Sequence, residues 1–212
     1  MTPPRRRPDA GGAPRRRAKR TVSGRPKTVY QVLVTLREVR PPVWRRILVH
    51  GNITLGRLHR VLQAAMGWEE SHLHMFKVQG RRFSDPKFQL DDDGDVKVHD
   101  ETRITLEAAS RKGKQGIVYE YDFGDRWHHD LKVERVLDPA DAPATVPAVA
   151  AGARACPPED VGGAPGYESF LWALAHPNHK EHEHYREWIG GPFDPEQFDV
   201  GEAARRVRAF MR

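Results

Sequence analysis

Between residues 28 and 80, three stretches of the chain have the apolar and polar pattern of β-strands. Residues 28–37 read TVYQVLVTLR, an alternating run rich in β-branched side chains that predicts a strand. Pro41 and Pro42 interrupt this run, and residues 43–49, VWRRILV, predict a second strand antiparallel to the first. Residues 72–78, HLHMFKV, predict another strand, with a turn at Gly80 and a short return strand.

A helical spacing of apolar residues begins after Thr54, a good N-cap, and ends at Gly67, a good C-terminal stop. The apolar stripe of this helix consists of Leu55, Leu58, Val61, Leu62 and Ala65.

The strongest hairpin signal lies between residues 117 and 137. GIVYEYDF and WHHDLKVERVL flank a turn at Gly124 and Asp125, and a short helix over residues 105–110 precedes them. The Pro/Ala-rich residues 138–153 predict a linker, and the remainder predicts helices, the last beginning at Asp194 and Pro195. Strands followed by helices predict an α+β fold with a helical C-terminal third.

Positive charge is concentrated at the N-terminus. Residues 1–27 carry ten basic residues against one acid, Asp9, for a net charge of +9, whereas the remainder has 25 basic and 28 acidic residues, or −3. The ten are Arg5, Arg6, Arg7, Arg15, Arg16, Arg17, Lys19, Arg20, Arg25 and Lys27. Few large apolar residues accompany them, so we expect a disordered arm (1–27) followed by one domain (28–212). Such an arm attracts nucleic acid through counterion release; a solubilising tail is the alternative.

Composition excludes several classes of protein. No apolar run approaches the roughly 20 residues of a membrane span, so we expect no membrane partner. Cys156 is the only cysteine, which excludes an intrachain disulfide and favours a reducing cytoplasm. The acidic residues 91–95, DDDGD, do not fit an EF-hand frame, because Gln89 would stand at the first ligand position; a solvated turn is expected.

Four long segments, in order, resemble the plasmid pRiA4b ORF-3-like family over about residues 28–207. They are RPPVWRRI from Arg40, TLGRLHRVLQAAMGWEESHLHMF from Thr54, YEYDFGDRWHHD from Tyr119, and ACPPEDVGG from Ala155 through FDPEQFD at Asp199. The resemblance implies a compact α+β fold with a bent, mostly antiparallel sheet and packed helices. It also implies an association with mobile elements, because some members are insertion-sequence passenger proteins of a TnpR type.

This chain departs from the family pattern at three positions. Val161 stands where relatives often have a second cysteine, and Arg126 and His128 stand where they often have Gly and Glu; His129 keeps the family position. A two-cysteine metal or redox device is therefore excluded within this chain. None of its serines lies in a recognisable resolvase frame, so we expect no recombinase chemistry.

Two histidines lie two positions apart in a predicted strand, so their side chains should point the same way. His72 and His74 would then offer a metal pair that His129, Asp125, Cys156, Glu159 and Asp160 could complete, with zinc or another divalent ion as the metal. The alternative is that both are partly buried sheet residues with hydrogen-bond partners.

Catalytic candidates gather in the same two segments. Asp122, Asp125 and Asp130 surround the hairpin turn and could act as general acids or Mg²⁺ ligands, or could simply cap the turn. Cys156 would be a nucleophile if His129 lowered its pKa, and Glu159 and Asp160 adjoin it; a structural loop is the alternative.

The His-dense stretch from His179 to Trp188 lacks the HExxH order of a metalloprotease and predicts a pH-sensitive helix face.

The leading interpretation is a non-enzymatic, nucleic-acid-associated accessory protein of a mobile element, with no cofactor expected. One alternative is a metal-assisted hydrolase built from the His, Cys and Asp candidates. Another is a protein-interaction module without a ligand, which would act on a protein partner.

Overall fold

The computed structural model describes residues 28–90 and 97–210. Eight strands in that part of the chain form one sheet in the order β5-β4-β3-β6-β7-β1-β2-β8. Their bounds are β1 Val29–Leu36, β2 Trp44–His50, β3 His74–Val78, β4 Arg81–Ser84, β5 Val98–Asp100, β6 Ile117–Tyr121, β7 Trp127–Leu137 and β8 Ala148–Ala153. Every pairing is antiparallel except that of β4 with β5, which confirms the α+β prediction with a mostly antiparallel sheet.

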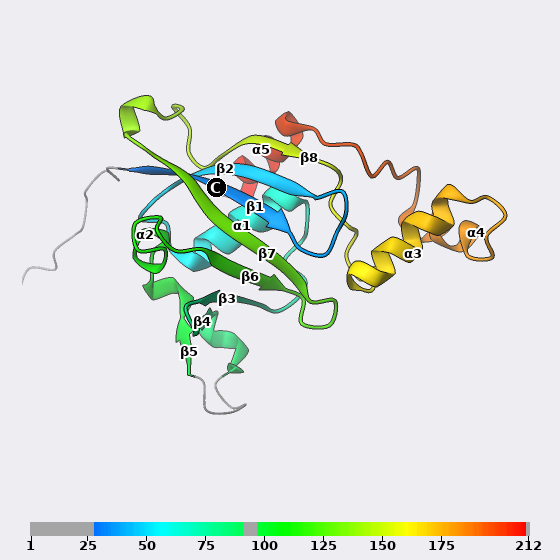
Figure 1. Cartoon of the computed structure of the whole chain (residues 1–212), viewed down its shortest axis with the longest axis horizontal. Helices are drawn as coiled ribbons and strands as arrows, with labels where there is room; N and C mark the ends of the chain where they lie inside the picture. Colours follow the sequence, from blue (N-terminus) through cyan, green and yellow to red (C-terminus); the bar gives the residue numbers. More distant parts are fainter. Residues whose placement is uncertain (1–27, 91–96, 211–212) are drawn as a thin grey trace, which may run out of the picture.

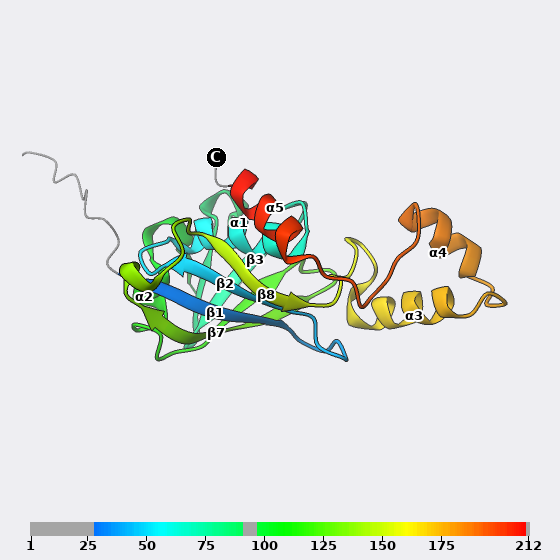
Figure 2. The ribbon, with the colours of Figure 1, turned by 90° about the horizontal axis from the view of Figure 1, so that it is seen from above.

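Helices cover one face of the sheet and extend from its end. Their bounds are α1 Leu55–Met66, α2 Leu106–Ala109, α3 Gly163–Ala175, α4 His182–Ile189 and α5 Val200–Phe210. Figure 2 shows α1 and α5 on one side of the sheet, while β1 and β7 face outwards on the other side. Helices α3 and α4 pack together and extend away from the sheet (Figure 1), so the C-terminal third is helical as predicted.

Helix α1 begins and ends where the sequence places its caps. The Thr54 hydroxyl accepts a hydrogen bond from the Arg57 backbone N–H, and Gly67 ends the helix in the left-handed conformation. The predicted apolar stripe is buried against the sheet, where it meets Tyr119 and Tyr121 of β6 and Trp127 of β7. This packing brings the C-terminal end of α1 and the loop that follows it towards the end of β6.

Three segments differ from the prediction. Residues 148–153, expected in a linker, form β8 and pair with β2 at the sheet edge. The last helix begins at Val200 with Asp199 accepting from the Glu202 N–H, whereas Asp194 forms a separate turn. Strand β3 begins at His74, so His72 lies in the loop before it.

No helix in the described ranges is both long and apolar enough to cross a membrane. The basic arm (residues 1–27) and the acidic segment at residues 91–95 lie outside the described residues.

Candidate metal centre

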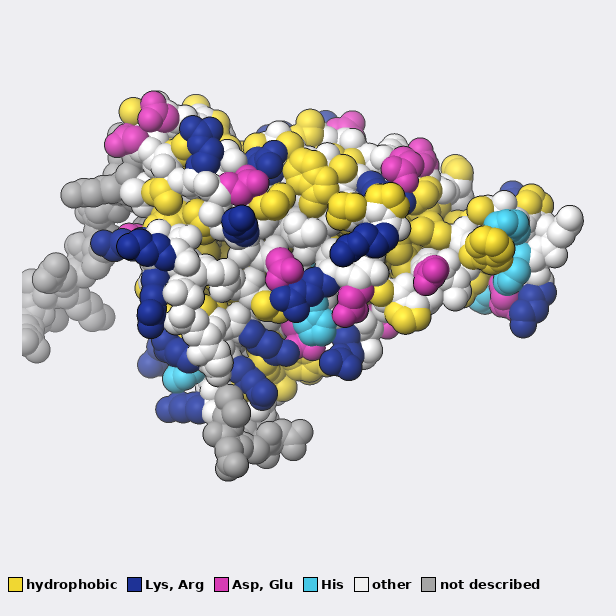
Figure 3. Space-filling view, viewed as in Figure 1, with side chains coloured by type: hydrophobic (Ala, Val, Ile, Leu, Met, Phe, Trp, Pro, Cys, Tyr) yellow, Lys and Arg dark blue, Asp and Glu magenta, His cyan; other side chains and the backbone are white. Residues whose placement is uncertain are grey.

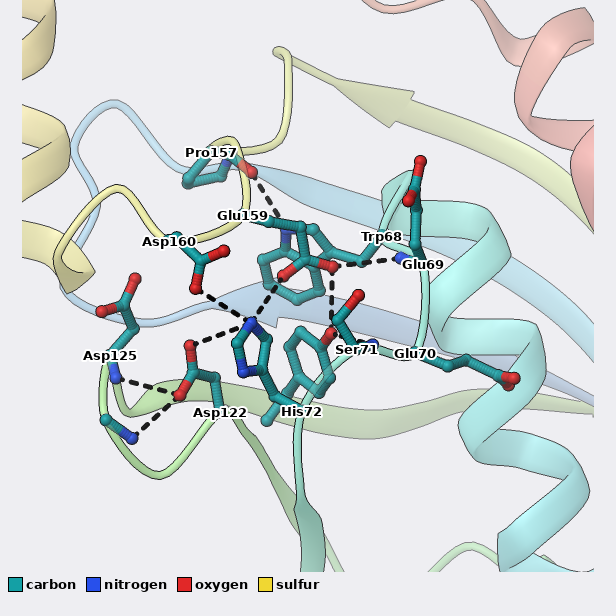
Figure 4. A network of polar contacts seen from close by, with 12 residues as sticks. Trp68, Glu69, Glu70, Ser71, His72, Asp122, Asp125, Pro157, Glu159 and Asp160 are labelled. Atoms are coloured by element: carbon teal, nitrogen blue, oxygen red, sulfur yellow. Dashed lines mark hydrogen bonds and ion pairs between the residues drawn. The ribbon is translucent and has the colours of Figure 1, made fainter. Parts of the chain in front are cut away.

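Three segments that are distant in the sequence meet beside the end of β6. The loop before β3 supplies His72, the turn after β6 supplies Asp122, and the loop before α3 supplies Glu159 and Asp160 (Figure 4). One ligand atom each from His72, Asp122 and Asp160 lies within 4.8 Å of the other two. Because imidazole nitrogen and carboxylate oxygen are the common ligands of divalent cations, this cluster is the candidate metal centre.

The imidazole of His72 faces three carboxylate groups. Its Nε2 atom lies 3.1 Å from Asp160 Oδ1, 3.7 Å from Asp122 Oδ2 and 3.7 Å from Glu159 Oε2. Yet His72 Nε2 and Glu159 Oε2 are buried atoms without a hydrogen-bond partner of suitable geometry among the described residues. Ligand atoms about 2.1 Å from a tetrahedral ion stand about 3.4 Å apart, so these separations match a ligand set.

Backbone conformation aims both aspartates at His72. Asp122 and Asp160 adopt the left-handed region, with φ of 57° and 58°, which Asp tolerates better than most residues. Asp122 Oδ1 accepts hydrogen bonds from the Gly124 and Asp125 N–H groups at 2.9 and 3.3 Å. Its other oxygen, Oδ2, is therefore left to face the imidazole.

Glu159 is held by a second layer of hydrogen bonds. Its Oε1 atom accepts from the Glu69 backbone N–H at 3.0 Å and from the Tyr121 hydroxyl at 2.9 Å. The Tyr121 oxygen in turn accepts from the Ser71 N–H. Burial raises the pKa of the Glu159 carboxyl above its usual value, and neighbouring Asp160 adds to the increase.

Two further long-range hydrogen bonds anchor the loop that carries Glu159 and Asp160. The Trp68 indole Nε1 donates to the Pro157 carbonyl at 2.9 Å, and the Gly162 N–H donates to Asp125 Oδ2 at 3.0 Å. Gly163 packs so tightly on the hairpin turn that an added Cβ atom would lie 2.5 Å from the Asp125 carbonyl oxygen. Asp125 thus links the hairpin to the loop through this hydrogen bond, and its carboxylate is not directed at His72.

His74, expected beside His72, lies in a separate buried group. Its Nε2 atom lies 2.9 Å from Glu101 Oε2, and its ring stacks on His59 with centroids 3.5 Å apart. The expectation that the two histidines point the same way was wrong because only His74 belongs to the strand. Burial, together with the nearby His74 and Lys87, lowers the pKa of His59 to about 2.

His129 also lies outside the cluster, fully buried in the core. Its ring meets Trp68 edge-on, and its Nδ1 atom lies 3.3 Å from the Tyr119 carbonyl oxygen. Burial lowers the pKa of His129 to about 4. It is therefore a neutral core histidine at pH 7.

Cys156 lies in the wall of a neighbouring cleft of about 430 Å³, which Arg45 and Arg206 also line. Burial raises the pKa of its thiol to about 12, although Arg45 opposes the increase. The charges that act on this thiol come from Arg45, Glu159 and Arg206, and not from His129 as expected. Among the charges of the described residues that act on this thiol, none belongs to a histidine that would serve as the base for a nucleophilic Cys156.

The third aspartate of the hairpin, Asp130, lies away from the candidate metal centre. Asp130 points to the outer face of the sheet, where Arg37 pairs with it at 2.5 Å. Asp122, weighed in the sequence only with its hairpin neighbours, is instead the partner of His72. The signal that could have identified it is an aspartate directly after a buried strand, where a tight turn favours the left-handed conformation.

Comparison with known proteins identifies relatives of the whole described body. The profile of the plasmid pRiA4b ORF-3-like proteins matches residues 28–202. The uncharacterised protein y4hQ of Sinorhizobium fredii (strain NBRC 101917 / NGR234) is 42% identical over 163 residues, covering 77% of this chain and 81% of that protein. The crystal structure of the protein of unknown function MM3350 from Methanosarcina mazei Go1 is similar with a TM-score of 0.74 and 32% identity. That likeness covers 83% of this chain and 96% of the archaeal one. The chain therefore belongs to the plasmid pRiA4b ORF-3-like family.

Proposed function

We propose that the protein binds one divalent cation through His72, Asp122 and Asp160 and uses it in metal-assisted hydrolysis. One observation carries the proposal: a buried imidazole nitrogen faces three carboxylate oxygens and makes a well-formed hydrogen bond with none of them. Without a cation, this arrangement leaves like charges crowded around an unsatisfied nitrogen, which is unfavourable. With a cation, all of these atoms gain a partner.

The ligand chemistry favours zinc or manganese. One imidazole nitrogen with carboxylate oxygens suits both ions, whereas the thiolate that soft ions prefer is missing, since Cys156 is not part of the cluster. The side chain of Asp160 is 71% exposed, so the outer side of the centre faces solvent. A water molecule there could be ionised near neutral pH, because Zn²⁺ lowers the pKa of bound water to about 7. Glu159, whose Oε2 atom lies 3.7 Å from His72 Nε2, would accept a hydrogen bond from that water and orient it.

The test is metal binding by protein prepared without a histidine tag. Elemental analysis and calorimetric titration with Zn²⁺ and Mn²⁺ should give one ion per chain. An ion present at 100 times its dissociation constant stabilises the folded state by about 2.7 kcal/mol. For a chain of this size, that raises the midpoint of thermal unfolding by about 5–10 °C.

The His72→Ala variant should lose both the ion and the stabilisation. The matched control is His184→Ala on α4, because the His-dense stretch could itself hold transition metals weakly; this variant should behave like the parent. Hydrolysis of bis(p-nitrophenyl) phosphate and p-nitrophenyl acetate with each ion tests the catalytic half. A parent protein that neither binds nor is stabilised by either ion would end the proposal.

Nucleic-acid association through the Arg-rich arm is the second candidate function. It is supported by the +9 charge of residues 1–27, and the mobile-element context and a cytoplasmic location remain parts of this proposal. Binding of labelled DNA should weaken steeply with salt. A full-length variant with the ten basic arm residues changed to Gln should lose most of its affinity; unchanged binding would refute the role of the arm.

A further inference from the structure

Among the described residues, no helix packs on one face of the sheet, and this face carries a continuous row of side chains. Strand register places the members of this row opposite one another across six strands. The row consists of Trp44, Thr35, Asp130, Val118, Lys77 and Arg82. A second, shorter row consists of Arg46, Leu33 and Lys132. We call the surface formed by these two rows the open sheet face, and it is the face seen in Figures 1 and 3.

Three acids of the open sheet face and its borders form ion pairs. Arg37 pairs with Asp130 at 2.5 Å, Arg46 with Glu134 at 2.6 Å, and Lys77 with Glu120 at 2.5 Å. Each carboxylate is thus matched by one cation.

Further cations in the described part of the chain form no ion pair with a carboxylate, although the charge of Lys132 does help to lower the pKa of Glu134. Lys132 and Arg82 on the face, and exposed Arg135 beside it, have no ion pair among the described residues. Figure 3 shows Lys and Arg side chains spread over this face and along the side that carries α2, β4 and β5. The surface therefore has a positive excess, although residues 28–212 carry a net charge of −3.

A groove of about 600 Å³ crosses the open sheet face beside the start of β6. It lies between residues 113–118 and 130–133, and its exposed cations are Lys114 and Lys132. Neither lysine forms an ion pair within the described residues. Val118 also lines the groove, and the neighbouring Asp130 is paired with Arg37. The groove thus offers two unpaired ammonium groups and an apolar floor.

We propose that the open sheet face binds single-stranded nucleic acid, with Lys114 and Lys132 contacting its phosphates. The proposal rests on the nucleic-acid association described above and adds a surface on the folded body. Charge complementarity selects a polyanion. Half-exposed Leu33, Val118 and Trp44 between the cations give unstacked bases an apolar surface, with Trp44 able to stack on a base. Within residues 28–90 and 97–210, no helix or ribbon projects from this face to enter the groove of a duplex.

The test is fluorescence anisotropy of a labelled 20-nucleotide single strand with the full-length protein over a range of salt concentrations. For single strands each phosphate contact contributes about 0.7 to the salt slope, so Lys114→Gln with Lys132→Gln should lower it by about 1.4. That change corresponds to binding about 25-fold weaker at about 0.1 M salt. The matched control is Arg205→Gln with Arg208→Gln, two exposed cations of α5 on the opposite side of the sheet.

The outcomes separate the two proposals. A parent protein that binds no nucleic acid overturns both. A parent that binds, with equal affinity for the lysine variant and the α5 control, overturns the open sheet face alone and leaves the arm. An unlabelled duplex that competes more than tenfold better than the single strand overturns the assignment to single strands. A loss confined to the lysine variant, with unchanged circular dichroism, supports the inference.

Discussion

Replacing Asp125 by Ala should weaken the attachment of the loop that carries Glu159 and Asp160 to the β6–β7 hairpin. The substitution removes the carboxylate oxygen that accepts the Gly162 N–H at 3.0 Å, a contact between residues 37 positions apart. This bond is one of four that hold the loop near His72, together with those from Trp68, Glu69 and Tyr121, so its loss should affect both stability and the candidate metal centre.

The size of the effect follows from the type of bond. A hydrogen bond to a charged group contributes about 1.5–3 kcal/mol. Because this bond is exposed to solvent, we take the low end of that range and expect a loss of about 1.5 kcal/mol in the free energy of unfolding, or about 3–6 °C in the midpoint of thermal unfolding. If the loop is released in most molecules, the affinity for the cation should fall by about tenfold or more, because only the docked fraction binds.

Urea denaturation followed by circular dichroism measures the first effect, and calorimetric titration with Zn²⁺ or Mn²⁺ measures the second. Asp130→Ala is the matched control: it removes an aspartate from the same hairpin, but one whose ion pair with Arg37 is exposed on both sides. Exposed pairs contribute about 1 kcal/mol or less. Equal losses in the free energy of unfolding for the two substitutions would show that the Asp125–Gly162 hydrogen bond does not hold the loop.

Three further predictions concern single groups. Gly163→Ala should lower the free energy of unfolding in urea by more than about 2 kcal/mol, because φ is +66° and the new Cβ atom would meet the Asp125 carbonyl oxygen. Gly191 has open space around it, so Gly191→Ala should change the free energy of unfolding little. Similar losses of stability for the two variants would contradict this packing. Cys156, whose pKa is about 12, should react with iodoacetamide at pH 7.5 far more slowly in the native than in the urea-unfolded chain, and equal rates would contradict the raised pKa of its thiol. The pKa of His129 is about 4 in the folded chain and about 6.5 in the unfolded chain. Below pH 6.5 the unfolded chain therefore binds a proton that the folded chain does not bind, and about 3 kcal/mol of the free energy of unfolding should be lost by pH 4. In urea titrations at several pH values, His129→Phe should reduce this dependence of stability on pH.

Local sequence patterns account for most of the fold. Alternation and β-branched residues identify β1 and β2, and Thr54 and Gly67 bound α1, because these signals act within a few residues. Strand β8 escaped prediction since its sequence, AVAAGA, has little intrinsic strand preference; pairing with β2 at the sheet edge makes it a strand.

The candidate site is harder to predict from the sequence, because it depends on the residues at which the strands and helices end. The sequence singled out His72, Glu159 and Asp160, and the structure brings these three together with Asp122. It grouped His74 and His129 with them on the assumption that nearby motifs share one site. In the structure a strand boundary turns His74 towards Glu101, and the core encloses His129. Neither outcome can be read from spacing alone.

The order of strands has a consequence for synthesis on the ribosome. β1 lies between β2 and β7, and Gln31 of β1 reaches Glu134 of β7 across 103 positions of the chain. At about 5–20 residues per second, β1 and β2 therefore leave the ribosome roughly 5–20 s before β7 is available. For that interval the nascent hairpin has an unpaired edge, which chaperones or early α1 packing would need to shield from other chains.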